Sequence, residues 1–173
     1  MENQIVNRIA KSSIVNIDLE HFQPPGKRSS IDLSQWLDQG FLLREKHFRT
    51  SLKNHDWQQY QDHYVALQCS TDAILPSWAY LLVTSHLHCI AKLVVQGTIE
   101  ELEKIIYSHM VSQMDLEPYR NKPIMINGCY NISIPDDAYV LLVQRLQNVA
   151  KSIFFGESCS SVPLWKVKRS VPK

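Results

Sequence analysis

The sequence has few glycines, and none of them forms a nucleotide-binding motif. Five glycines occur in 173 residues. Neither the GxGxxG pattern of dinucleotide-binding proteins nor the glycine-rich phosphate loop of nucleotide hydrolases is present. The GxSxG motif, which carries the nucleophile of many serine hydrolases, is missing as well. These absences disfavour nucleotide binding and serine hydrolysis.

The chain also lacks an excess of either charge and a long apolar run. There are 18 basic and 17 acidic side chains, so no basic excess favours binding to the phosphates of nucleic acid. No apolar stretch approaches the roughly 20 residues that a membrane-spanning helix needs. Residues 1–10 mix charged and polar residues with apolar ones, unlike a secretory signal. We therefore expect a cytoplasmic protein that binds neither nucleic acid nor membrane.

The length and the hydrophobic content of 45% are sufficient for one core. We expect a single domain over residues 1–173, with an N-terminal mixed cap at 1–63, a core at 64–159 and a tail at 160–173. Four cysteines are present. In a cytosolic chain of this size they are better explained by metal binding, redox chemistry or core packing than by disulfides.

The second half of the sequence repeats itself at an offset of 59 residues. Eight residues between Pro76 and Gly97 are identical to their counterparts between Pro135 and Gly156. Each copy has a short apolar run ending in cysteine, then a proline and a helical apolar pattern, then a second apolar run ending in glycine. This order predicts an α/β fold in which two βαβ units supply about four strands to one parallel sheet. The alternative explanation is that any two βαβ units share an apolar rhythm.

Other segments predict further elements. The residues from Thr98 to Met114 have one apolar helical face, and Thr98 with Glu101 forms a capping box. Alternating polarity predicts a strand over Ile14–Leu19. We expect a loop over Gln23–Ser30 and helices over Ile31–Leu37 and Arg44–Asn54, with a break at Gly40.

Three cysteines lie at strand ends in the predicted sheet. Cys69 ends the first strand, Cys129 ends the third, and Cys159 follows the fourth. The carboxyl ends of parallel strands meet at one edge of a sheet, beside helix N-termini that stabilise thiolates. We therefore expect the three thiols to lie together and to bind zinc or an iron–sulfur cluster. The alternative is that they are buried strand-end residues without a function.

Three thiolates leave one position of a tetrahedral site open. Asp72, three residues after Cys69, is the leading candidate for this position, and Glu157 is the second. A water molecule or a substrate is a further alternative. The fourth cysteine, Cys89, lies within a predicted helix, and we expect it to be buried in the core.

Three stretches, which begin at His55, Ile126 and Ala150, carry a family resemblance: HDWQQYQDHYVALQCSTDAILPSWAYLL, INGCYNISIPDDAYV and AKSIFFGESCSSVPLWK. They resemble the corresponding parts of an uncharacterised family of bacterial proteins, known as a domain of unknown function. The resemblance implies no activity. It implies a bacterial cytosolic setting and an association with the machinery that mobilises sulfur for iron–sulfur cluster assembly, whose proteins are therefore expected partners.

The leading hypothesis is a metal-binding protein with an accessory role in iron–sulfur cluster or sulfur handling. One alternative is a thiol enzyme, in which one cysteine takes up or relays sulfur and another resolves the intermediate. A second alternative is a metal-free interaction module that presents aromatic residues such as Trp78, Tyr80 and Tyr139. The sequence leaves open whether the protein is an enzyme and which oligomer it forms.

Overall fold

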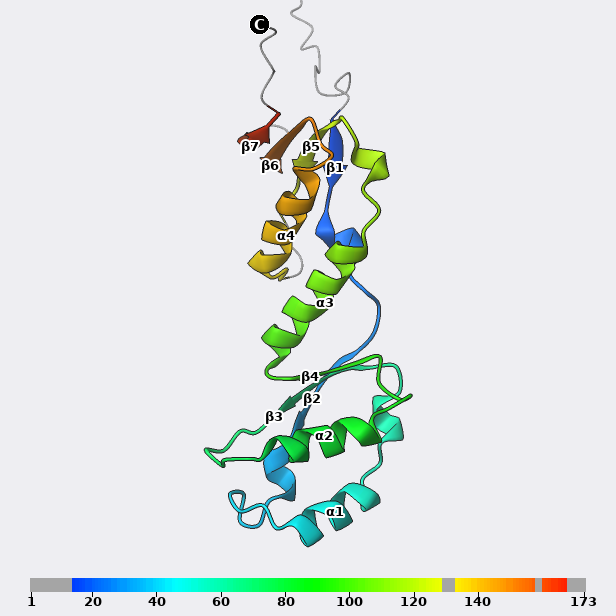
Figure 1. Cartoon of the computed structure of the whole chain (residues 1–173), viewed down its shortest axis with the longest axis vertical. Coiled ribbons are helices and arrows are strands. Elements are labelled where there is room, and N and C mark those ends of the chain that lie inside the picture. Colours follow the sequence, from blue (N-terminus) through cyan, green and yellow to red (C-terminus); the bar gives the residue numbers. More distant parts are fainter. Residues whose placement is uncertain (1–13, 129–132, 158–159, 168–173) are drawn as a thin grey trace, which may run out of the picture. The chain divides into compact units, whose positions relative to one another are not determined.

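The computed structural model describes residues 14–128, 133–157 and 160–167. The chain divides into two compact units (Figure 1). Unit 1 consists of residues 1–24 and 106–173, and unit 2 of residues 25–105. The sequence predicted a single domain, whereas each unit has its own sheet and its own hydrophobic core.

Unit 2 contains a sheet of three parallel strands in the order β2-β3-β4. These strands are β2 (Arg28–Asp32), β3 (Tyr64–Gln68) and β4 (Leu93–Gln96). The connecting helices are α1 (Glu45–Asn54) and α2 (Ser77–His86), and two short 3₁₀ helices are η2 (Leu33–Trp36) and η3 (Gln58–Tyr60). Each crossover between neighbouring strands therefore contains one α-helix, as parallel pairing requires.

The core of unit 2 lies between the sheet and the two α-helices. Val65 and Leu67 of β3 are both fully buried in it, because alternate residues of a strand point to the same face. Phe48 and Leu52 are one helical turn apart on α1, and Ala79 and Val83 have the same spacing on α2. This spacing places one apolar stripe of each helix on the sheet.

Unit 1 contains a mixed sheet in the order β1-β5-β6-β7. Its strands are β1 (Val15–Ile17), β5 (Pro123–Ile126), β6 (Ser152–Glu157) and β7 (Ser160–Lys166). The first three are parallel, and β7 runs antiparallel to β6. The helices are α3 (Ile99–Gln113), α4 (Asp136–Leu146), η1 (Leu19–Phe22) and η4 (Glu117–Tyr119). The boundary between the two units falls within α3, because unit 2 ends at Ile105 and unit 1 resumes at Ile106.

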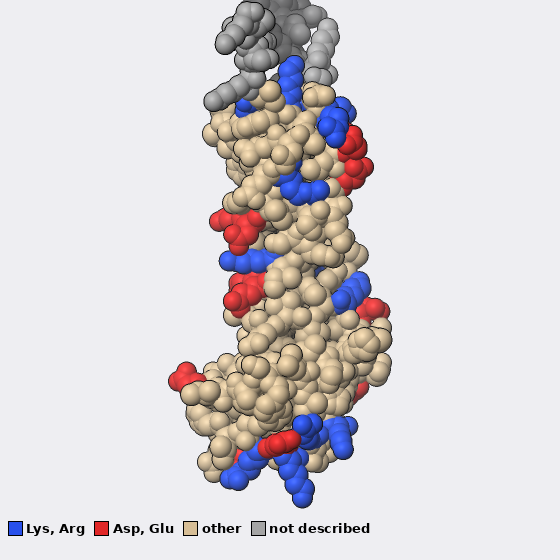
Figure 2. Space-filling view, in the orientation of Figure 1, with Lys and Arg blue, Asp and Glu red and all other residues tan. Residues whose placement is uncertain are grey.

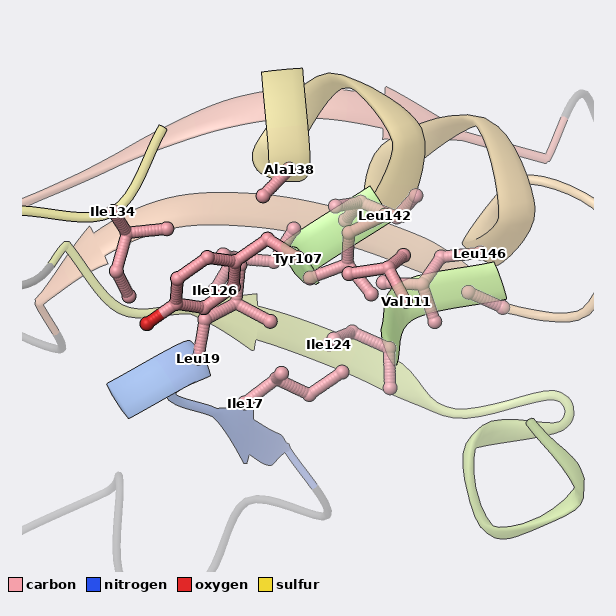
Figure 3. Close-up of a cluster of buried hydrophobic side chains, with 12 residues drawn as sticks. Ile17, Leu19, Tyr107, Val111, Ile124, Ile126, Ile134, Ala138, Leu142 and Leu146 are labelled. Atoms are coloured by element: carbon pink, nitrogen blue, oxygen red, sulfur yellow. The ribbon is translucent and has the colours of Figure 1, made fainter. Parts of the chain in front are cut away.

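The core of unit 1 has the same construction as that of unit 2 (Figure 3). Its strand residues include Ile124 and Ile126, which alternate along β5. Tyr107 and Val111 contribute from α3 with a spacing of one helical turn. Leu142 is among the residues of α4 that are fully buried against them.

The predicted start of the α3 helix is confirmed. The backbone N–H of Thr98 donates to the Glu101 carboxylate at 2.7 Å, and the backbone N–H of Glu101 donates to the Thr98 hydroxyl at 3.2 Å. The two residues therefore form a reciprocal capping box.

The predicted α/β class is confirmed, but the strands are distributed differently from the prediction. The prediction of a single parallel sheet was wrong, because β3 and β4 belong to one sheet and β5 and β6 to another. The sheet of unit 1 is mixed because β7 adds an antiparallel edge. Apolar runs indicate that strands exist, but the choice of partners depends on contacts between distant residues, which such runs do not show.

The ends of the chain also depart from the predicted organisation. Residues 14–63 supply β1 to one sheet and β2 to the other, so they do not form a cap packed on a finished sheet. Residues 160–166 form the strand β7 rather than a tail. No helix within the described ranges is sufficiently long and apolar to span a bilayer.

Candidate functional site at the carboxyl edge of unit 2

The carboxyl ends of β2 and β3 place several polar side chains side by side in unit 2. Asp32, the last residue of β2, is in register with Gln68, the last residue of β3. The chain then continues into η2 on one side and through Cys69, Ser70 and Thr71 on the other. This carboxyl edge is where open α/β sheets bind ligands.

Asp32 joins the two chain segments at this edge. Its Oδ1 accepts hydrogen bonds from the backbone N–H of Ser34 at 2.9 Å and of Ser70 at 3.1 Å. Its Oδ2 accepts a hydrogen bond from the Ser70 hydroxyl at 2.5 Å. The hydroxyls of Ser34 and Ser70 lie 3.2 Å apart. The carboxylate thus fixes the start of η2 against the loop that follows β3.

The same hydrogen bonds keep Asp32 ionised. Partial burial opposes the charged form, but the hydrogen bonds from Ser70 and Ser34 outweigh it and lower the pKa of the carboxyl from 3.8 to about 2. Asp32 therefore carries a negative charge throughout the neutral and mildly acidic range.

Cys69 lies between the anchored residues and the strand. Its side chain is half-buried, and its Sγ lies 3.4 Å from the Thr71 hydroxyl. That hydroxyl donates to the backbone carbonyl of Gly40 at 2.8 Å. Because Ser70 is tied to Asp32 and Thr71 to Gly40, both residues that follow Cys69 are held in place.

Tyr80, in the first turns of α2, belongs to the same electrostatic environment. Burial raises the pKa of its hydroxyl, and electrostatic interactions with Cys69 and with Asp32 raise it further. Over the described ranges, no Lys, Arg or His forms a hydrogen bond or an ion pair with Cys69 or Asp32. The edge therefore combines one thiol with acidic and hydroxyl groups.

The predicted metal ligands fall in different parts of the chain. Cys69 directly follows β3 in unit 2, and Asp72 is exposed on the same loop. Glu157 ends β6 in unit 1. Cys129 and Cys159 lie outside the described residues. No group of three His, Cys, Asp or Glu that could hold a metal ion is found among the residues that the structure describes. A site shared by the three cysteines therefore stays a prediction.

The prediction that Cys89 is buried was wrong. α2 ends at His86, three residues before Cys89. Leu87, the first residue after the helix, is buried in the core. Cys89 itself is exposed and has a positive φ of 61°. The apolar periodicity predicts a helix through Cys89, but the chain turns out of the helix after His86.

The aromatic residues of the interaction hypothesis are partly buried. Trp78 and Tyr80 pack against the core of unit 2, and Tyr139 packs against the core of unit 1. The ring of Tyr139 makes an edge-on contact with Phe155, with ring centroids 5.6 Å apart. In the described structure, all three rings therefore contribute to packing.

Sequence reasoning missed Asp32, although a signal was present. The tripeptide Ile-Asp-Leu occurs at residues 17–19 and again at residues 31–33. In both places the aspartate lies at the carboxyl end of a strand, and its carboxylate accepts a hydrogen bond from the backbone N–H two residues later. This N–H belongs to Glu20 for Asp18 and to Ser34 for Asp32. Aspartate is a preferred capping residue for this reason.

Comparison with known proteins gives a family without an assigned activity. A family model described as a protein of unknown function, DUF2480, matches residues 3–167. The chain belongs to the DUF2480 family. No curated protein and no solved structure matches it. The DUF2480 match spans segments of both units and includes every residue of the carboxyl edge described above.

Proposed function

We propose that this DUF2480 protein binds a thiophilic metal, as zinc or as an iron–sulfur cluster, and that Cys69 is one of the ligands. The observation that carries the proposal is that Cys69 precedes two residues whose side chains are anchored, Ser70 to Asp32 and Thr71 to Gly40. A ligand that is held in place before binding loses less conformational freedom when it binds.

The surroundings of Cys69 favour a metal over a thiol enzyme. A nucleophilic cysteine is usually activated by a nearby base or cation. Among the described residues, the Thr71 hydroxyl lies 3.4 Å from this thiol, and Tyr80 interacts electrostatically with both the thiol and the anionic Asp32. A metal cation supplies the missing positive charge itself and displaces the thiol proton as it binds.

No group of three potential ligands is found among the described residues, so we look for the further ligands outside them. We propose Cys129 and Cys159 as these ligands, with Asp72, Glu157 or a solvent molecule in the fourth position. Thiolate ligands suit zinc and iron–sulfur clusters alike, so the ligand set does not choose between them. An accessory role in iron–sulfur cluster or sulfur handling is part of this proposal and rests on the family resemblance.

The experiment is metal analysis of the full chain after aerobic and anaerobic purification, with a visible spectrum to detect a cluster. The test variant is Cys69→Ser, and the matched control is Cys89→Ser, which removes an exposed thiol outside the edge. We expect Cys69→Ser to lose most of the metal and Cys89→Ser to keep it. A wild-type chain without zinc or iron, or a Cys69→Ser variant that keeps its metal, contradicts the proposal.

The same proposal includes an internal repeat of two βαβ units at the 59-residue offset. Matched backbone hydrogen bonds support it. The backbone N–H of Asp62 donates to the carbonyl of Ile90 at 2.9 Å. At the equivalent position 59 residues later, the backbone N–H of Asn121 donates to the carbonyl of Val149 at 2.8 Å. A second equivalent pair joins the backbone N–H of Lys92 to the carbonyl of His63 at 2.8 Å and the backbone N–H of Lys151 to the carbonyl of Lys122 at 2.9 Å. A crystal structure in which residues 64–96 and 123–155 fail to superpose would contradict the repeat.

A further inference from the structure

Large apolar side chains are exposed on two loops beside the carboxyl edge of unit 2. Phe41 is 64% exposed and Leu42 is 53% exposed in the turn that follows η2. Ile74 is 98% exposed in the loop between β3 and α2. Single exposed apolar residues are common, but three on adjoining loops are typical of an interaction surface.

Hydrogen bonds hold both loops in place. Asp38 and Leu42 pair through two backbone hydrogen bonds of 2.8 and 3.0 Å, which close the turn that carries Phe41. The Thr71 hydroxyl donates to the carbonyl of Gly40, the residue before Phe41, at 2.8 Å. The two loops are therefore joined, and their exposed side chains lie on a preorganised surface.

The charges of these loops are acidic. Residues 33–43 contain one charged residue, Asp38, and residues 69–85 contain one, Asp72. Asp38 is paired with Arg44 at 2.5 Å, whereas Asp32 stays anionic beside the loops. Arg44 and the basic residues of α1 directly follow the first loop in the chain, and blue side chains gather where α1 lies at the lower end of Figure 2.

We propose that the loops 38–42 and 69–75 form a docking surface for a segment of a partner protein that carries apolar side chains flanked by Lys or Arg. Apolar anchors would contact Phe41 and Ile74, and basic side chains would lie against Asp72 and Asp32. An anionic membrane or a second copy of the same surface would bring like charges together, so both are disfavoured. The proposal requires no metal, but it shares Asp72 with the ligand set proposed for the metal, so the apolar variants Phe41→Ser and Ile74→Ser are the ones that test it separately.

The test is selection of random peptides, displayed on phage, against the full-length chain. We expect the selected peptides to combine apolar residues with Lys or Arg. Binding of these peptides, measured by fluorescence anisotropy, should weaken about tenfold or more in Phe41→Ser and in Ile74→Ser, and it should weaken with added salt. Asp72→Lys should weaken binding without removing an apolar contact.

Val140→Ser is the matched control, because Val140 is a 56% exposed residue of α4 in unit 1. It should bind the peptides as the wild type does. Circular dichroism checks that the variants are folded, and metal content is measured in parallel so that a failure here is distinguished from a failure of the Cys69 proposal. The proposal is overturned if no peptide is selected, if the selected peptides are acidic, or if Phe41→Ser and Ile74→Ser bind normally. Binding to phosphatidylserine vesicles, or a dimer in sedimentation that Ile74→Ser dissociates, would also overturn it.

Discussion

The hydroxyl of Ser70 donates a 2.5 Å hydrogen bond to the carboxylate of Asp32, 38 residues earlier in the chain. This bond connects the end of β2 with the residue that follows Cys69. Asp32 thereby acts on the thiol through the backbone of the loop, as a positioning residue. The geometry of Cys69 depends on this pair, because the thiol makes one hydrogen-bond contact with the residues that the structure describes, namely with Thr71.

Ser70→Ala should loosen the loop that carries Cys69. The variant removes a hydrogen bond to a charged group at an exposed site, so we expect a loss of about 1 kcal/mol in the free energy of unfolding. The Cys69 thiol should also react faster with a disulfide reagent, measured in a Cys89→Ser background. Ser30→Ala, an exposed position on β2, is the control and should change neither quantity. An unchanged reaction rate in Ser70→Ala would show that the hydroxyl does not restrain the thiol.

Acid should weaken the connection that Asp32 makes. Its folded pKa of about 2 lies below the ordinary value of 3.8, so the unfolded chain takes up a proton first as the pH falls. The stabilisation is fully present above about pH 4 and is lost as the pH decreases toward 2. Urea unfolding measured between pH 5 and pH 2.5 should show this loss, and it should be smaller in Asp32→Asn. Equal acid sensitivity of the two proteins would contradict the assignment.

His55 should make the chain less stable in mild acid. Its ring contacts Trp36 and Trp57, with centroid distances of 5.1 and 4.7 Å, and its Nε2 lies 3.2 Å from the Tyr60 hydroxyl. Burial lowers the pKa of His55, although the charge of Asp56 opposes the shift. The unfolded chain therefore binds the proton more readily, and stability decreases as the pH falls through about 6.5.

The measurement is the urea midpoint at pH 7.5 and at pH 5.5, with tryptophan fluorescence as the probe. His55→Gln should reduce the difference between the two midpoints. His47→Gln, at an exposed position of α1, should leave it unchanged. If both variants behave as the wild type does, another group accounts for the acid sensitivity.

Cys89 should tolerate replacement, and glycine should improve stability there. The residue is exposed and has a φ of 61°, a conformation that costs a residue with a side chain more than it costs glycine. Cys89→Gly should raise the free energy of unfolding by up to about 1 kcal/mol, and Cys89→Ala should leave it nearly unchanged. Destabilisation of about 2 kcal/mol in both variants would instead indicate a buried cysteine.

Several local elements of this fold follow from the sequence, but the strand partners do not. The apolar runs that begin at Tyr64 and Pro123 predicted β3 and β5, and the capping box at Thr98 predicted the start of α3. β1 spans three residues and pairs with β5, more than 100 residues later. A run this short carries little apolar pattern, and nothing local in it indicates a partner so distant.

Only part of the candidate site could be predicted from the sequence, because the pairing of distant strands is not visible in it. Cys69 was identified because strand ends are visible in the apolar pattern. Asp32 was missed because β2 was read as part of a loop and a helix, so no strand end was expected there. The hydrogen bonds that lower the pKa of Asp32 come from residues two and 38 positions away, and the second of these depends on the pairing of β2 with β3.

The most direct test of the central claim is X-ray absorption at the metal edge of the chain as purified without oxygen. If Cys69, Cys129 and Cys159 are ligands of one zinc ion, three sulfur atoms should appear at about 2.3 Å, with one lighter atom completing the shell. Cys69→Ser should then show at most two sulfur atoms, and Cys89→Ser should show three. A metal shell without sulfur in the wild type, or an unchanged sulfur count in Cys69→Ser, would contradict the role of Cys69 as a ligand.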